Sequence, residues 1–141
     1  MRLWKGPIDM ERANYCFVCG KDNPKSLHLE FKNTAQHTVT AFFKLEHEYE
    51  GYPNIIHGGI LAAILDDAMA NTVIIDNIPI YTVELNVKYI KRCLVLEDLQ
   101  VKGWVKSMQH RIIETEGEIR NLEGELKTIA TGKYFIKSIS E

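Results

Sequence analysis

The chain has 141 residues and a mass of 16.2 kDa, about the most common size for one protein domain. With 45% hydrophobic and 26% charged residues it has the composition of a globular protein, which excludes disordered and fibrous classes. A net charge of −2 gives no overall electrostatic reason to bind nucleic acid or an anionic membrane. We therefore expect a single domain over residues 1–141, with no nucleic acid and no membrane among its partners.

The sequence gives no indication of a membrane span, a signal peptide or a disulfide framework. The longest unbroken apolar run, residues 60–65, is too short to span a bilayer, and the first residues contain no apolar stretch of signal-peptide length. Three cysteines, an odd number, do not suggest a secreted disulfide framework. These features predict a cytoplasmic protein.

The first half of the chain predicts an irregular segment, two strands and a loop. Residues 1–25 look irregular, and apolar and polar side chains then alternate over 27–32 as in a half-buried strand. Residues 38–45 are rich in β-branched and aromatic side chains, so we expect a partner strand there. Charge, glycine and proline over 46–54 predict a loop.

A helix is expected from Gly58 to about Ile75, because strong helix formers dominate this stretch. It is apolar on all sides, which is typical of a buried helix. Strand-like blocks follow, separated by short polar breaks that predict three hairpin connections. The blocks are 80–90, 99–107, 111–120 and 125–139. An antiparallel sheet curled around one central helix, an α+β architecture, accounts for this order.

Two acids, Asp66 and Asp67, lie in the middle of the helix, too far from its start to cap it. Helical spacing surrounds Asp66 with small residues such as Gly59, Ala62 and Ala63, which leave room for a substrate to approach. Asp66 is therefore a candidate catalytic acid, and Asp67 a candidate substrate-binding residue. The alternative is that both carboxylates bind backbone groups or an arginine across the core.

The sequence His57-Gly58-Gly59 stands at the head of the helix. Glycines there allow close approach of a ligand, and the free N–H groups at the positive end of the helix dipole can bind an anion or a developing oxyanion. His57 and Gly58 are candidate catalytic residues, and Gly59 is a candidate binding residue. Alternatively, His57 only caps the helix or lies in the core.

The stretch HGGILAAILDDAMA, residues 57–70, resembles the helix motif of the hotdog-fold acyl-CoA thioesterases of the PaaI-like, or phenylacetate-degradation, group. In that group the catalytic acid follows the histidine by nine residues, the position of Asp66. The stretch YCFVCGKDNP, residues 15–24, resembles the CxxCG..NP signature of one branch, and residues 81–89 are similar to the strand after the helix. Over residues 15–137 the resemblance implies a hotdog fold, an antiparallel sheet wrapped around one long helix.

The resemblance also implies an activity, the hydrolysis of acyl-CoA to a free acid and coenzyme A. By this resemblance, the N–H of Gly58 is expected to polarise the thioester carbonyl, and Asp66 is expected to activate water or to attack directly. Thr82 matches a hydroxyl position that helps to hold the attacking water, although an ordinary strand threonine is the alternative. No cofactor is expected, because coenzyme A is part of the substrate.

Gly58 and Asp66 are separated by about 12 Å along one helix, too far to serve the same carbonyl. Two subunits must then contribute to each site, in agreement with the family's dimer, whose sheets join edge to edge. We expect a homodimer or a dimer of dimers.

The remaining binding candidates are Asn54, Lys91 and Arg92. Some relatives have Asn or Gln where Gly51 stands here, and Asn54 is a candidate substitute. Lys91 and Arg92 lie at a strand end and could meet the phosphates of coenzyme A, the alternative being a solvated strand end.

Cys16 and Cys19 supply the CxxC half of a zinc site, but a closed tetrahedral site needs two more ligands. Cys93 and five scattered histidines offer no matching second pair, so we expect no metal and a turn packed near the active site.

Two rival functions remain. A non-enzymatic acyl-CoA-binding or regulatory hotdog protein would have no need for a buried acid. A hotdog dehydratase or hydratase requires a histidine in the loop before the helix, and residues 50–53 contain none.

Overall fold

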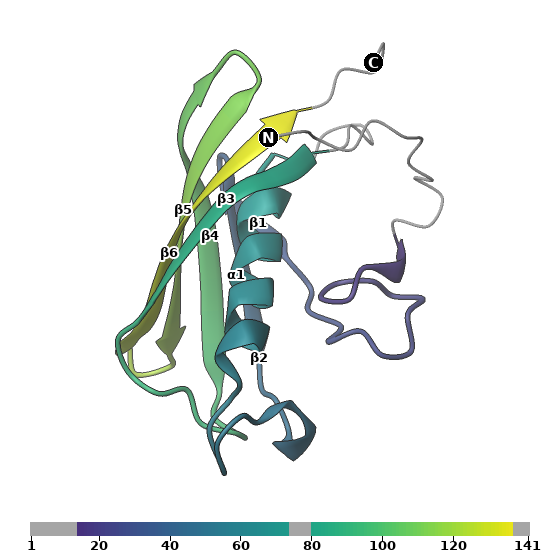
Figure 1. Ribbon diagram of the computed structural model, residues 1–141, viewed down its shortest axis with the longest axis vertical. Coiled ribbons are helices and arrows are strands. Elements are labelled where there is room, and N and C mark those ends of the chain that lie inside the picture. Colours follow the sequence, from purple (N-terminus) through teal and green to yellow (C-terminus); the bar gives the residue numbers. More distant parts are fainter. Residues whose placement is uncertain (1–13, 74–79, 137–141) are drawn as a thin grey trace.

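The structure, a computed structural model, describes residues 14–73 and 80–136. In these residues one long helix packs against a curved six-stranded antiparallel sheet (Figure 1). The strands are β1 (Lys32–Ala35), β2 (Thr38–Phe43), β3 (Ile80–Tyr89), β4 (Leu99–Gln109), β5 (Ile112–Asn121) and β6 (Leu126–Ile136), and the helix is α1 (Gly58–Asn71). Their order across the sheet is β1-β2-β4-β5-β6-β3. The predicted α+β architecture is confirmed.

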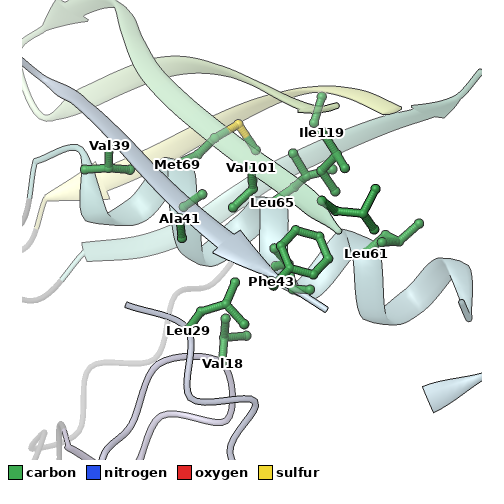
Figure 2. Close-up of a cluster of buried hydrophobic side chains, with 14 of the residues drawn as sticks. Val18, Leu29, Val39, Ala41, Phe43, Leu61, Leu65, Met69, Val101 and Ile119 are labelled. Atoms are coloured by element: carbon green, nitrogen blue, oxygen red, sulfur yellow. The ribbon is translucent and has the colours of Figure 1, made fainter. Parts of the chain in front are cut away.

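The core lies between α1 and the concave side of the sheet (Figure 2). The helix contributes large apolar side chains at helical spacing, so they form one stripe that faces β2, β4 and β5. This stripe consists of Leu61, Ile64, Leu65, Ala68 and Met69, all of them buried. The other face of α1 is only partly covered, and Gly59 on it is exposed. The prediction of a helix buried on all sides is therefore wrong for the single chain.

Two glycines allow α1 to lie directly on the sheet. Gly103 of β4 and Gly117 of β5 are paired across the two strands. A Cβ at Gly103 would lie 3.1 Å from the carbonyl carbon and oxygen of Ala68, and one at Gly117 would lie 3.2 Å from Leu65 Cδ2. A side chain at either position would push the helix away from the sheet.

Of the strand expected over 27–32, only Lys32 belongs to the sheet, as the first residue of β1. The N–H groups of Leu27 and Leu29 donate to the carbonyls of Phe17 and Val18, at 2.8 and 3.0 Å, so this segment pairs with the irregular amino-terminal part of the chain. His28 has a positive φ of 55°, which interrupts the extended backbone. The alternation nevertheless identified an inward side chain, because Leu29 is buried in the core together with Val18 (Figure 2).

One of the three expected hairpins is also absent. The β4–β5 and β5–β6 hairpins form as predicted, but β3 pairs with β6 and β4 with β2. The connection over 90–98 crosses to the loop before α1, where the N–H of Ile56 donates to the carbonyl of Cys93 at 2.9 Å and Ile55 bridges to Leu94. As a result β3 lies at the edge of the sheet.

The boundaries of the remaining elements are close to those expected. The helix ends at Asn71 rather than near Ile75, because Thr72 and Val73 form a turn. Positions 74 and 75 of the expected helix and 137–139 of the last expected strand lie outside the described residues. Within the described ranges, no helix is long and apolar enough to cross a membrane.

Candidate active site

Asp66 lies on the third turn of α1 and is held by two hydroxyl groups. Thr82 of β3 donates a hydrogen bond of 2.9 Å to Asp66 Oδ1, and Tyr134 of β6 donates one of 2.8 Å to the same oxygen. No hydrogen bond within the described ranges involves Oδ2 of Asp66. One carboxyl oxygen is thus fixed by the sheet, while the other is free to accept a proton or to attack an electrophile.

Tyr134 lies at the candidate site beside Asp66 and was not predicted from the sequence. It is fully buried and is paired with Thr82 across β3 and β6, so the sheet register delivers both hydroxyls to the same carboxyl group. Burial and the negative charge of Asp66 raise the pKa of Tyr134 above its usual range, so the phenol remains a donor. The sequence carried no signal for it beyond a tyrosine in a strand, because the pairing partner of that strand was unknown.

The His57-Gly58-Gly59 sequence forms the amino-terminal end of α1. His57 is the N-cap residue, and its Nδ1 accepts a hydrogen bond of 2.9 Å from the N–H of Gly59. The cap that was left open as an alternative for His57 is therefore present. The N–H of Gly58 has no acceptor among the described residues, and it lies at the positive end of the helix dipole.

A groove of about 1210 Å³ opens at this end of the helix. Its walls are the loop from Gly51 to Gly58, the end of β3 with Tyr89, and the segment that follows it. The Tyr89 hydroxyl donates to the carbonyl of Gly58 at 2.7 Å, which fixes β3 against the head of the helix. The groove is mainly apolar in its lining, and Gly58, whose N–H has no acceptor among the described residues, forms part of one wall, so the groove can hold an acyl or thioester group there.

Three cations lie along the groove. Lys91 Nζ is 2.6 Å from Glu125 Oε2, and the buried Lys127 lies 3.4 Å from the other oxygen of Glu125 and 3.3 Å from a carboxyl oxygen of Glu97. Arg92 is exposed, and its side chain has no ion-pair partner among the described residues. Of the two predicted phosphate ligands, Arg92 is thus available, whereas Lys91 is already paired.

Asp67 faces away from the groove, toward the amino-terminal segment. Its Oδ1 lies 3.7 Å from Cys16 Sγ, and the Sγ atoms of Cys16 and Cys19 and a carboxyl oxygen of Asp67 lie within 4.8 Å of one another. Burial raises the pKa of Asp67 to about 7. Hydrogen bonding by the Cys19 thiol lowers the pKa of Cys16 to about 5, and the same contact raises that of Cys19.

The predicted site residues therefore separate into three groups. Asp66 and Thr82 lie together on the middle of the helix, and His57, Gly58, Lys91 and Arg92 lie at the groove, with Gly59 beside them on the first turn. Asp67 lies with the cysteines. Asn54 belongs to none of these groups: it is exposed at a positive φ of 66°, its backbone N–H donates to Glu50, and it is not among the residues that line the groove.

Residues 53–128, more than half of the chain, match the model of the thioesterase superfamily. The chain belongs to the thioesterase superfamily. A search of curated proteins finds no match. The matched stretch contains α1, β3, β4 and β5, and with them Gly58, Asp66 and Thr82.

Solved structures of thioesterases share the fold of this thioesterase-superfamily protein. A thioesterase superfamily protein is 24% identical, with a TM-score of 0.81 over 96% of this chain and 68% of its own. A hypothetical thioesterase from Streptococcus pneumoniae, solved with coenzyme A, is 22% identical, with a TM-score of 0.72 over 78% of this chain and 86% of its own. The Escherichia coli PaaI protein of the phenylacetic acid degradation operon is 13% identical, with a TM-score of 0.75 over 89% of this chain and 92% of its own. These matches confirm the predicted hotdog fold and its likeness to PaaI.

Proposed function

We propose that this thioesterase-superfamily protein is an acyl-CoA thioesterase, with each active site formed between two copies of the chain. The observation that carries the proposal is the carboxyl group of Asp66, fixed through one oxygen by Thr82 and Tyr134 and free at the other. A protein that only binds a thioester has no use for such a group. Superfamily membership supports thioester hydrolysis as the reaction.

In the proposed reaction the thioester carbonyl oxygen accepts a hydrogen bond from the N–H of Gly58, and the helix dipole stabilises the charge that develops on it. Asp66 either takes a proton from a water molecule, whose oxygen attacks the carbonyl carbon, or attacks this carbon itself to give an anhydride that water then hydrolyses. In both routes the carbon–sulfur bond breaks and coenzyme A leaves as a thiolate, which is then protonated. The products are a carboxylic acid and coenzyme A.

Recognition of coenzyme A is assigned to the basic side of the groove. Arg92 is exposed beside the groove and can pair with a phosphate, while Lys91 would have to exchange Glu125 for the ligand. A related fold from Streptococcus pneumoniae was solved with coenzyme A, which supports this class of ligand.

The two-copy site rests on the geometry of α1 and β3. The groove at Gly58 does not include Asp66, which lies eight residues further along the same helix. Strand β3 is ten residues long, lies at the edge of the sheet, and carries both Thr82 and Tyr89. An edge of this length is a ready surface for strand pairing, and pairing through it would bring Asp66 of one copy toward the groove of the other.

Turnover of a panel of acyl-CoA esters tests the proposed activity. We expect release of free thiol from at least one aliphatic or aromatic acyl-CoA, because the site holds both an acid and an oxyanion donor. Hydration of an enoyl-CoA and calorimetric binding of the same esters are measured in parallel. Binding without turnover of any thioester would make the protein a binding module, and hydration in place of hydrolysis would make it a hydratase.

Mixed dimers test the two-copy site. Asp66→Asn and Gly58→Pro are each expected to be inactive as homodimers. Co-expressed and purified with two different tags, the mixed dimer contains one site that lacks both groups and one intact site. Purification through both tags leaves only mixed dimers, in which one of the two sites is intact, so we expect about half of wild-type activity. No gain over the two inactive parents, in a sample shown to contain the mixed species, would place both groups of a site on one chain.

A further inference from the structure

We propose that Cys16, Cys19 and Asp67 form a binding site for a soft divalent cation, with Zn²⁺ as the best match. Their ligand atoms lie within 4.8 Å of one another, although Asp67 is far from the cysteines in sequence. The site is separate from the proposed active site, and the inference does not depend on the proposed function.

The distances suit tetrahedral zinc. With Zn–S near 2.3 Å and Zn–O near 2.0–2.2 Å, neighbouring ligand atoms of a tetrahedral site lie about 3.6–3.8 Å apart. Cys16 Sγ and Asp67 Oδ1 are 3.7 Å apart. This sulfur and this oxygen therefore need almost no movement to take a metal between them.

Asp67 has an unsatisfied atom at the same place. Its Oδ2 is buried and has no hydrogen-bond partner, and none of the ion pairs between described residues includes this carboxyl group. A buried carboxyl oxygen without a donor is costly. A cation bound by the thiolates would offset the cost of burying this oxygen, and this would explain why an acid lies beside the two cysteines.

The two cysteines are held in place by a tight turn. The N–H of Gly20 donates to the carbonyl of Cys16 at 2.8 Å, and a Cβ at Gly20 would lie only 2.4 Å from the N of Cys16 and from the carbonyl oxygen of Asn14. The N–H of Val18 lies 3.4 Å from Cys16 Sγ, a donor that stabilises a ligating sulfur. The turn therefore holds both thiols in position in the absence of a metal.

The donor set selects the metal. Two sulfurs and one carboxyl oxygen favour Zn²⁺ over Mg²⁺ and Ca²⁺, which prefer sites made of oxygen ligands alone. The cluster supplies three ligands, so water completes the tetrahedron. Bound there, the metal would fix the amino-terminal segment to α1 one residue after Asp66. The sequence alone does not bring these three ligands together, because the third comes from the helix rather than from a second pair of cysteines or histidines.

Cobalt substitution tests the site in the full-length protein, reduced and stripped of metal. Titration with Co²⁺ is expected to give thiolate-to-cobalt charge-transfer bands and the strong visible bands of tetrahedral Co²⁺, both removed by one equivalent of Zn²⁺. Cys16→Ser and Cys19→Ser should abolish the charge-transfer bands. Asp67→Asn should weaken Zn²⁺ binding by about a hundredfold, measured by competition with a chelator.

Two substitutions serve as matched controls. Cys93→Ala removes the third cysteine, and Asp66→Asn removes the neighbouring acid; both should keep the full Co²⁺ spectrum. In the wild-type chain, Zn²⁺ should also protect two of the three thiols from alkylation, a readout that depends on no variant. An unchanged affinity in Asp67→Asn would overturn the three-ligand site. Absence of thiolate bands in the reduced wild-type protein, or isolation of Cys16 and Cys19 as a disulfide that binds no metal, would overturn the proposal altogether.

Discussion

Replacing Asp66 with asparagine is expected to reduce kcat for the best acyl-CoA by about 10²–10⁴-fold, the usual contribution of a general acid or base. The fold should survive, because both donors to this residue, Thr82 and Tyr134, bind Oδ1, and an asparagine can offer an oxygen at that position. What the amide replaces is Oδ2, the oxygen without a partner. The loss should therefore appear in kcat, with KM changed far less.

Three further measurements separate chemistry from structure for this position. Asp98→Asn repeats the substitution at an exposed surface aspartate that pairs with Lys44, and activity there should remain at the wild-type level. Tyr134→Phe removes one donor to Oδ1 but keeps the acid, so its effect should be much smaller than that of Asp66→Asn. Thermal unfolding of all three variants checks that each is folded. Wild-type turnover by a folded Asp66→Asn protein would exclude Asp66 as the catalytic acid.

The elements of the fold were largely predictable because periodicity reports which side of an element is buried. The stretch from Gly58 has the composition of a helix, and the four later blocks have that of strands. Residues 27–32 show the limit of this signal, since Leu29 does point into the core but its N–H pairs with Val18 instead of a strand. Alternation identifies the inward side and says nothing about the hydrogen-bonding partner.

Pairing between distant strands was the main feature that the sequence did not contain. Consecutive strands were expected to form hairpins, yet β3 pairs with β6, and that single exchange places Tyr134 beside Thr82 and under Asp66. The proximity of Asp67 to Cys16 and Cys19 also depends on tertiary packing, so it could not be predicted from the sequence. Residues on one helix could be related by spacing alone, so Asp66 and Gly58 could be predicted as candidates from the sequence, whereas contacts that depend on tertiary packing could not.

Replacing Gly58 with proline should lower kcat by about 10²–10³-fold, the usual effect of losing one donor to a developing oxyanion. The only hydrogen-bonding group that proline removes is the N–H, which has no acceptor within the described residues, so no hydrogen bond of the fold is lost. The backbone suits it as well. Gly58 is the first residue of α1, where proline is favoured, and His57 before it has φ −57° and ψ 130°, the extended conformation that proline demands of its predecessor.

Gly58→Ala is the matched control, because it adds the same Cβ and keeps the N–H. That Cβ would lie 3.3 Å from Cζ of Tyr89, a close contact that a small movement of the ring relieves, so we expect less than about a tenfold loss in kcat. The ratio between the two variants corrects for the added Cβ and reports the loss of the N–H together with the two further ring carbons of proline. Equal activity of Gly58→Pro and Gly58→Ala would mean that the carbonyl is polarised elsewhere. A large ratio, together with recovery of activity in the mixed dimer with Asp66→Asn, would assign the two halves of the site to two different chains.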